Sequence, residues 1–169
     1  MPSKRRPATM DDVYTKPGYL FRRMQQIAVS IFVEECKDFD LTPVQYAALV
    51  AIRTHPGIDA TRLSAVIAFD RSTLGSVLER LEAKGLIERS AGAEDKRVKL
   101  LFLTAGGAAL LQRIMAAVDR AQDRILAPLK PADRKTLMAL LGQLVDLNNE
   151  VSRVPLRAED AIEHFKKSG

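Results

Sequence analysis

The sequence predicts a mainly α-helical fold that carries one short antiparallel β-hairpin. Apolar residues recur at helical spacing through most of the chain, from residue 18 to residue 147. A glycine stands at the C-terminal end of one of these helices, and two short apolar runs on either side of a polar turn follow it. The length of 169 residues fits one well-cored domain, or a small module with an accessory layer of helices.

Two helices are predicted in the first third of the chain. After Pro17 the chain enters a long helix over residues 18–38, whose apolar residues follow one face. A second helix is predicted over residues 43–53, because Thr42 and Gln45 are spaced as a capping box around a proline at the first helical position. A His-Pro-Gly sequence then ends this helix.

A short third helix over residues 60–67 leads to a fourth helix, which Asp70 caps. The fourth helix has an apolar stripe at the i, i+3, i+4, i+7 spacing, formed by Leu74, Val77, Leu78 and Leu81. Its opposite face is polar and consists of Arg71, Ser72, Thr73, Ser76 and Arg80. Gly85 follows at the position of a C-cap glycine.

The hairpin is predicted directly after Gly85. Its first strand covers residues 86–89 and its second strand covers residues 98–103, with an eight-residue polar turn between them. Helix, glycine, strand, turn and strand follow one another in this order within residues 58–103. That order predicts a winged helix-turn-helix, a fold that commonly binds duplex DNA.

Two further helices are predicted after the hairpin. Thr104 caps a fifth helix that extends to residue 126, a length of about 33 Å at about 1.5 Å per residue. Pro131 opens a sixth helix, whose apolar stripe consists of Leu137, Leu140, Leu141, Leu144 and Leu147. This stripe is longer than one small winged helix can cover. We therefore expect a second copy of the chain to cover it.

The polar face of the fourth helix and the tip of the hairpin hold the candidate DNA-binding residues. They are Arg71, Ser72, Thr73, Ser76 and Arg80 of the helix, and Lys96, Arg97 and Lys99 of the hairpin. Arg97 is the strongest candidate, since a guanidinium at the hairpin tip can enter the minor groove, and Asp95 is expected to stabilise that tip. Two alternatives remain open. Ser72 and Thr73 can serve only as favourable first-turn residues, and the Asp-Lys-Arg sequence can be a solvated turn.

The charge of the chain favours a polyanionic partner without requiring one. The net charge is +5 and the isoelectric point is near 9.5. Residues 59–104, however, hold eight basic and seven acidic side chains. The placement of single arginines therefore matters more than the net charge of this segment.

Other residue types argue against several classes of protein. Cys36 is the only cysteine, so no intramolecular disulfide can form, and with His55 and His164 it cannot build a typical structural zinc site. Paired carboxylates, a nucleophile elbow and a phosphate loop are missing, so we expect no enzyme, no cofactor and no metal. The sequence holds no recognisable signal peptide or membrane span. We expect no membrane partner and a location in the reducing cytoplasm.

Four segments resemble the MarR family of bacterial transcriptional regulators in order and spacing. They read DRST at 70–73, LERLEAKGLIER at 78–89, EDKR at 94–97 and LTAGG at 103–107, and the similarity extends from about residue 17 to residue 150. The resemblance implies a homodimer in which the first, fifth and sixth helices interlock. It also implies two winged helices on successive major grooves of a pseudopalindrome, about 10 base pairs apart, with Arg97 in the minor groove.

The predicted organisation has five parts. A flexible N-terminal arm (1–16) precedes the first two helices (17–57), which serve dimerisation and line an effector crevice. The winged helix-turn-helix (58–103) binds DNA, and the last two helices (104–153) serve dimerisation. For the C-terminal tail (154–169), an embrace of the dimer is one possibility.

Residues 17–26 and 42–49 resemble a subgroup that controls the catabolism of aromatic and heteroaromatic acids. This implies a repressor that is released by an aromatic carboxylate or its coenzyme A thioester, bound between the dimer helices and the winged helix. The candidate effector-binding residues are Tyr19, Arg22, Arg23, Tyr46 and His55. The tyrosines can stack on a ring, the arginines can pair with a carboxylate, and the histidine can add a titratable contact. An ordinary structural role is the alternative for each of them.

Two other functions remain open for this sequence. A redox-sensing regulator of the same fold would use Cys36, although the neighbouring carboxylates disfavour its thiolate and a buried, inert cysteine is the favoured interpretation. A winged helix that binds a protein instead of DNA would tolerate the replacement of Arg97 by alanine.

Overall fold

The computed structural model describes residues 8–92 and 96–157. These residues form seven α helices, two short 3-10 helices and one three-stranded antiparallel sheet. The α helices are α1 (Met10–Tyr14), α2 (Pro17–Glu35), α3 (Pro43–Thr54), α4 (Ala60–Val66), α5 (Arg71–Ala83), α6 (Ala105–Leu126) and α7 (Pro131–Leu147). The 3-10 helices are η1 (Lys37–Phe39) and η2 (Asn149–Val151), and the strands are β1 (Ile58–Asp59), β2 (Ile87–Ala91) and β3 (Lys99–Leu103).

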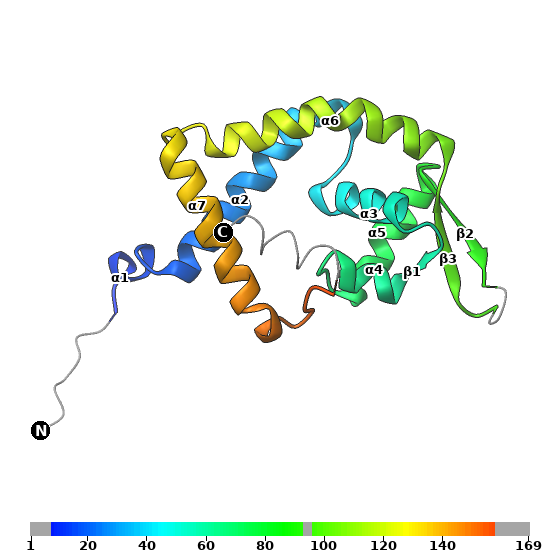
Figure 1. Ribbon diagram of the computed structural model, residues 1–169, viewed down its shortest axis with the longest axis horizontal. Helices are drawn as coiled ribbons and strands as arrows, with labels where there is room; N and C mark the ends of the chain where they lie inside the picture. The colour runs from blue at the N-terminus through cyan, green and yellow to red at the C-terminus, as the bar shows by residue number, and fades with distance from the viewer. Residues whose placement is uncertain (1–7, 93–95, 158–169) are drawn as a thin grey trace, which may run out of the picture.

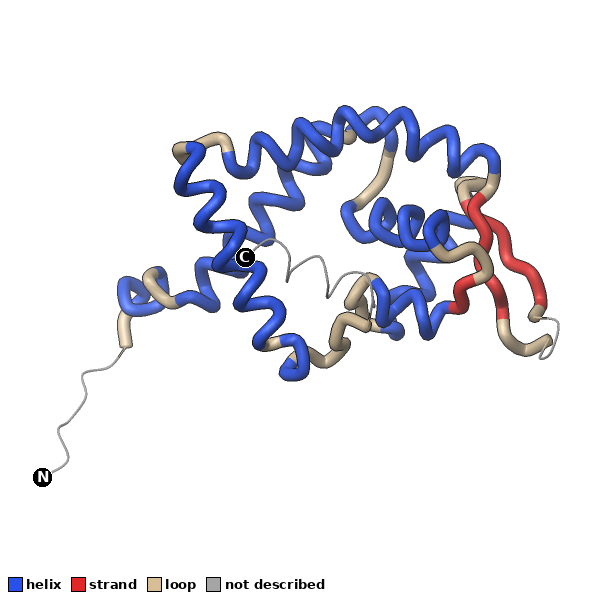
Figure 2. The backbone as a smooth tube through the Cα atoms, in the orientation of Figure 1, coloured by secondary structure: helices blue, strands red, loops and turns tan. Residues whose placement is uncertain are grey.

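Figures 1 and 2 show two regions with different construction. The winged lobe, residues 41–103, contains α3, α4, α5 and the sheet. The helical arm consists of α2, α6 and α7. In the arm, α6 packs against α2 and continues over the lobe, where it also packs against α3.

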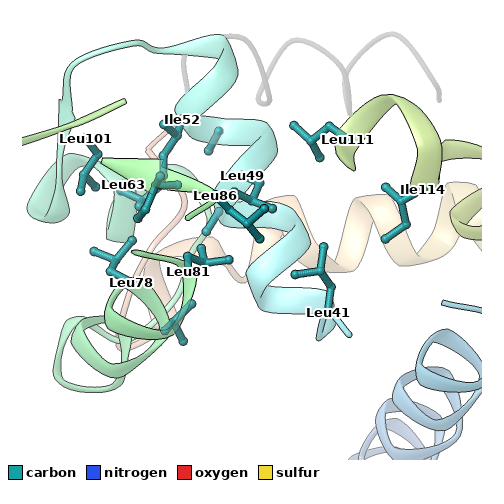
Figure 3. Packing of buried hydrophobic residues seen from close by; sticks show 14 of the residues in the cluster. Leu41, Leu49, Ile52, Leu63, Leu78, Leu81, Leu86, Leu101, Leu111 and Ile114 are labelled. Atoms are coloured by element: carbon teal, nitrogen blue, oxygen red, sulfur yellow. The ribbon is translucent and has the colours of Figure 1, made fainter. Parts of the chain in front are cut away.

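The core of the winged lobe lies between the helices and the sheet. The strand order is β1-β3-β2, with Ile58 opposite Leu101 and Ile87 opposite Leu103. Figure 3 shows the buried side chains of α3, α5 and the sheet converging, with Leu111 and Ile114 of α6 beside them. A single buried cluster therefore joins the lobe to the first half of α6.

A close junction fixes the start of α6 on the lobe. The Thr104 hydroxyl accepts a hydrogen bond from the Gly107 N–H at 3.0 Å and donates one to the Gly85 carbonyl at 2.7 Å. A Cβ atom on Gly107 would lie 2.2 Å from the carbonyl oxygen of Leu86. Only glycine permits this approach between the helix and the loop before β2.

Two helices of the arm, α2 and α6, are joined by ion pairs on their surface. Glu35 accepts hydrogen bonds from the Arg120 Nε at 3.2 Å and from the Arg124 Nη1 at 3.1 Å, and Arg124 also contacts Glu34 at 2.9 Å. These bonds hold the pKa of Glu35 below its usual value. They fix the register of α6 against α2.

The structure confirms the mainly helical class and the winged hairpin, and it confirms the three side-chain caps at Thr42, Asp70 and Thr104. It corrects the extent of several elements. The hairpin is part of a three-stranded sheet, because residues 58–59 add β1. The strands cover 87–91 and 99–103 instead of 86–89 and 98–103, and α2 ends at Glu35, before the predicted residue 38.

Both ends of the described chain make ordered local contacts. The arm expected to be flexible over 1–16 contains the helix α1, whose start is capped by Thr9 and Asp12. At the other end, residues 152–157 return to the lobe, where the Arg157 N–H donates to the Ala65 carbonyl at 3.0 Å. We call residues 149–157 the C-terminal clasp. The division into five functional parts stays a prediction.

Candidate nucleic-acid interface

The helix α5 is built with one buried side and one exposed side. Leu74, Val77, Leu78 and Leu81 are buried in the core, as the spacing predicts. Asp70 caps the helix, because its Oδ1 accepts hydrogen bonds from the Ser72 N–H at 2.8 Å and from the Ser72 hydroxyl at 2.6 Å. These two bonds lower the pKa of Asp70, and the charge of Arg153 lowers it further.

All five candidate residues of α5 are exposed: Arg71, Ser72, Thr73, Ser76 and Arg80. Two of them also have local roles. Ser72 contributes to the cap, and the Ser76 hydroxyl donates to the Thr73 carbonyl at 2.9 Å. The first-turn role considered for Ser72 is therefore present, and it leaves the side chain on the outer face of the helix.

The turn before α5 is fixed by hydrogen bonds between its two ends. The buried Ser64 hydroxyl donates to the Phe69 carbonyl at 2.8 Å, and the Phe69 N–H donates to the Ser64 carbonyl at 3.0 Å. Ala68 lies between them with φ +48°, in the left-handed region. This turn sets the angle between α4 and α5, the two helices of the helix-turn-helix.

The wing consists of β2, β3 and the turn between them. The Gly92 N–H donates to the Val98 carbonyl at 2.9 Å, which extends the pairing beyond the strands. Lys96, Arg97 and Lys99 are exposed, and the wing projects from the lobe at the end opposite α1 (Figure 1). Asp95, expected to stabilise the tip, lies outside the described residues.

Ion pairs that the sequence analysis missed hold both the wing and the end of α5. Arg89 of β2 pairs with Glu82 of α5 at 3.0 Å. The Lys84 Nζ, just after α5, pairs with the Asp40 Oδ2 at 2.7 Å and also donates to the Asp40 carbonyl. The hydrogen bond from Lys84 lowers the pKa of Asp40. No local spacing pattern signals such pairs, because the partners of the second pair are 44 residues apart.

The candidate effector-binding residues do not meet within one chain. Tyr19 lies near the start of α2, 5.3 Å from the Tyr14 ring, and the Arg22 guanidinium lies 5.0 Å from the centre of the Tyr19 ring. Tyr46 contacts Phe32, with ring centres 6.1 Å apart. Phe32 is thirteen residues after Tyr19 on the same helix, a rise of about 20 Å at about 1.5 Å per residue.

The two other candidates are Arg23 of α2 and His55 at the end of α3. The Arg23 Nη1 donates to the Gln26 side chain at 2.9 Å. His55 is half-buried at the C-cap of α3. Whether any of these residues contacts an effector stays a prediction.

The single cysteine is enclosed in the core. Cys36 is 1% exposed and forms the C-cap of α2. Burial raises the pKa of its thiol, Arg120 opposes this rise, and Glu35 adds to it. The net rise disfavours the thiolate that a redox sensor requires.

Within residues 8–92 and 96–157, no three His, Cys, Asp or Glu side chains gather in a way that would suit a metal ion. In the same part of the chain, every helix is too short or too polar to cross a membrane.

Comparison with known proteins places the chain in a family. The model of the MarR family matches residues 41–99. The HTH-type transcriptional repressor NicR of Pseudomonas putida is 30% identical over 135 residues, which are 80% of this chain and 85% of the relative.

Two solved structures are similar over nearly their whole length. CouR, a transcriptional repressor bound to a 23-mer DNA duplex, has a TM-score of 0.73 and 27% identity, and the match covers 83% of this chain and 99% of CouR. BpsR of Bordetella bronchiseptica, whose DNA binding is regulated by 6-hydroxynicotinic acid, has a TM-score of 0.74 and 29% identity over 83% of this chain and 99% of BpsR. The chain therefore belongs to the MarR family, and it is a DNA-binding transcriptional regulator and not an enzyme.

Proposed function

We propose that two copies of this chain form a repressor of a pseudopalindromic operator, and that a small aromatic or heteroaromatic carboxylate, or its coenzyme A thioester, releases it. The observation that carries the proposal is the exposed polar face of α5 beside a basic wing in one lobe. The bacterial cytoplasm is the compartment that this role requires, because the operator is there.

The DNA-binding roles follow from the positions of the side chains. Residues of the first turns of α5, from Arg71 to Ser76, contact base edges and phosphates in the major groove. Arg97 enters the adjacent minor groove. Arg80, Lys96 and Lys99 contact the phosphate backbone on either side and fix the register of the lobe.

The helical arm supports the dimer. The helix α7 has no buried residue, although it is rich in leucine. The exposed large apolar residues of α2 and α7 are Leu20, Phe21, Met24, Ile27, Val33, Met138, Leu140, Leu144, Val145 and Leu147. An apolar surface of this kind marks an interface. A second copy is the partner that also supplies the two-fold symmetry of a pseudopalindrome.

The effector class rests on the relatives and on the aromatic residues of α2 and α3. NicR is a repressor, and DNA binding by BpsR is regulated by 6-hydroxynicotinic acid. Tyr19 with Arg22 offers a ring and a guanidinium side by side, which suits an aromatic carboxylate. The effector must bind the DNA-free arrangement better than the DNA-bound one in order to release the operator.

The DNA-binding proposal is tested with duplexes from the region upstream of the chain's own coding sequence. We expect sequence-specific binding that weakens steeply with salt. Replacement of Arg97 by alanine should weaken it about 5- to 100-fold, whereas Lys130→Ala, at the N-cap of α7, should not. Binding that does not depend on salt would contradict the proposal. So would unchanged DNA binding by Arg97→Ala, which is the result expected of a winged helix that binds a protein.

The effector proposal is tested by thermal shift with 6-hydroxynicotinate, hydroxycinnamates and their thioesters, read beside operator binding. A true effector raises the melting temperature and weakens the operator complex. Arg22→Gln should reduce the response more than Arg23→Gln, since Arg22 lies over the Tyr19 ring. If both variants and the unchanged protein show the same thermal shift with the effector, Arg22 is not part of the effector site.

A further inference from the structure

The C-terminal clasp is a closed loop whose ends are tied to each other. The Asn149 side chain donates to the Leu156 carbonyl at 3.2 Å and accepts from the Leu156 N–H at 2.8 Å. The Arg157 guanidinium binds both oxygens of Glu150, at 2.5 and 2.8 Å. These paired contacts hold the loop between them in one shape.

The clasp is also anchored on the helix-turn-helix. The Arg157 N–H donates to the carbonyl of Ala65, in the last turn of α4, at 3.0 Å. Val154, Pro155 and Leu156 are half-buried. The clasp therefore attaches the end of α7 to the helix that precedes α5.

This attachment brings Arg153 to the first turn of α5. Its Nη2 lies 3.8 Å from the Oδ2 of Asp70, and its side chain is 92% exposed. The separation is beyond a good hydrogen bond, so Asp70 does not hold the guanidinium in place. The other oxygen of Asp70 is already bound to Ser72.

A negative charge at the start of α5 opposes the binding of DNA unless a cation lies beside it. The carboxylate of Asp70 caps the helix that faces the duplex, and a negative charge there repels phosphate. The guanidinium of Arg153 offsets this charge and has free surface on which to bind phosphate oxygens.

We propose that Arg153 contacts the DNA backbone beside the N-terminal end of α5, and that the clasp positions it there. This inference rests on the proposed binding of DNA by α5. It adds to the interface a residue that lies 82 positions after Arg71 in the chain, beyond the winged helix itself. Asn149 is a positioning residue for this contact.

The test measures binding of operator and of unrelated duplex DNA by Arg153→Gln over a range of salt concentrations. A lost phosphate contact reduces the slope of log affinity against log salt by about 0.9 for each protomer on the duplex. Both duplexes should be bound about two- to fivefold more weakly, because the backbone is the same in both. Arg153→Lys should retain most of the slope, and Asn149→Ala should lose part of it.

The control variant is Lys130→Gln, which removes one positive charge at the N-cap of α7. If Arg153→Gln and Lys130→Gln have the same slope, Arg153 does not contact DNA. If Arg153→Gln lowers the melting temperature without changing the slope, its role is to support the cap at Asp70 and the proposal is wrong. The proposed DNA binding by the winged lobe is tested separately with Arg97→Ala. It is contradicted if this variant binds the same duplexes as tightly as the unchanged protein.

Discussion

The winged lobe and the helical arm differ in how much of their apolar surface one chain can cover. In the lobe, α5 buries its whole stripe, and Leu81 is 0% exposed. In the arm, α7 buries no residue, and Leu147 is 80% exposed. Both helices have leucines at helical spacing. An apolar stripe therefore predicts a buried face but does not show whether the same chain or a second chain buries it.

A charge on α7 should disrupt the proposed dimer. Leu144→Glu places a charge on each side of the proposed symmetric interface, and we expect the dimer dissociation constant to rise more than about 100-fold. Sedimentation velocity measures the loss of dimer. Gln143→Glu adds the same charge at the neighbouring polar position and should leave the dimer largely intact. A Leu144→Glu variant that sediments like the unchanged protein would exclude this face from the interface.

A cavity in the core of the winged lobe should lower the stability of the protein. Leu81→Ala leaves a cavity in a closed core and should lower the free energy of unfolding by about 2–5 kcal/mol. Urea denaturation measures this loss. Leu147→Ala is the matched substitution in the arm, and it should lower the free energy of unfolding less, because in one chain this side chain is mostly in solvent. Equal losses at the two positions would mean that the arm is as closed as the lobe.

The junction between the regions can be tested with two neighbouring glycines. Gly107→Ala would place its Cβ against the Leu86 carbonyl and should cost about 1–3 kcal/mol. A Cβ on Gly106 meets its nearest atom at 3.5 Å, an ordinary contact. Gly106→Ala should therefore be neutral or stabilising by up to about 1 kcal/mol, as measured by thermal unfolding. A stable Gly107→Ala variant would show that α6 can shift on the lobe.

The smallest expected effect concerns the cap of α5. The pKa of Asp70 is lowered in the folded state by its bonds to Ser72 and by Arg153, so its ionised form stabilises the lobe. This stabilisation is fully present above the unfolded pKa of about 3.9 and is lost as the pH falls through the lowered pKa. Melting temperatures of Asp70→Asn and the unchanged protein should therefore converge as the pH falls below the lowered pKa. A difference that does not change with pH would mean that the charge of Asp70 is unimportant.

Local signals in the sequence were sufficient for most of the fold. The capping box at Thr42 and Gln45 and the cap at Asp70 act within a few residues, and the structure contains both. The strand β1 has only two residues, too short for a periodic pattern, and its pairing with β3 spans more than 40 residues. The clasp was missed for the same reason, since its anchor joins Arg157 to Ala65.

The exposure of the candidate site followed most directly from the sequence where the site lies on a regular element. The outer face of α5 follows from the position of its buried stripe, so the exposure of Arg71 and Arg80 was predictable. The contact of Tyr46 with Phe32, far along α2 from Tyr19, depends on how α2 and α3 cross. No spacing rule contains that angle.

The junction at Thr104 and Gly107 attaches the first turn of α6 rigidly to the loop before β2. Because the first turn of α6 cannot slip against the loop before β2, the helix and the lobe must turn together. A rotation of about 5° moves the far end of a helix about 33 Å long by about 3 Å. A ligand that shifts the outer half of α6 by that distance rotates the lobe by the same small angle. The length of α6 and the rigidity of its first turn thus determine how far the lobe rotates for a given shift of the helix.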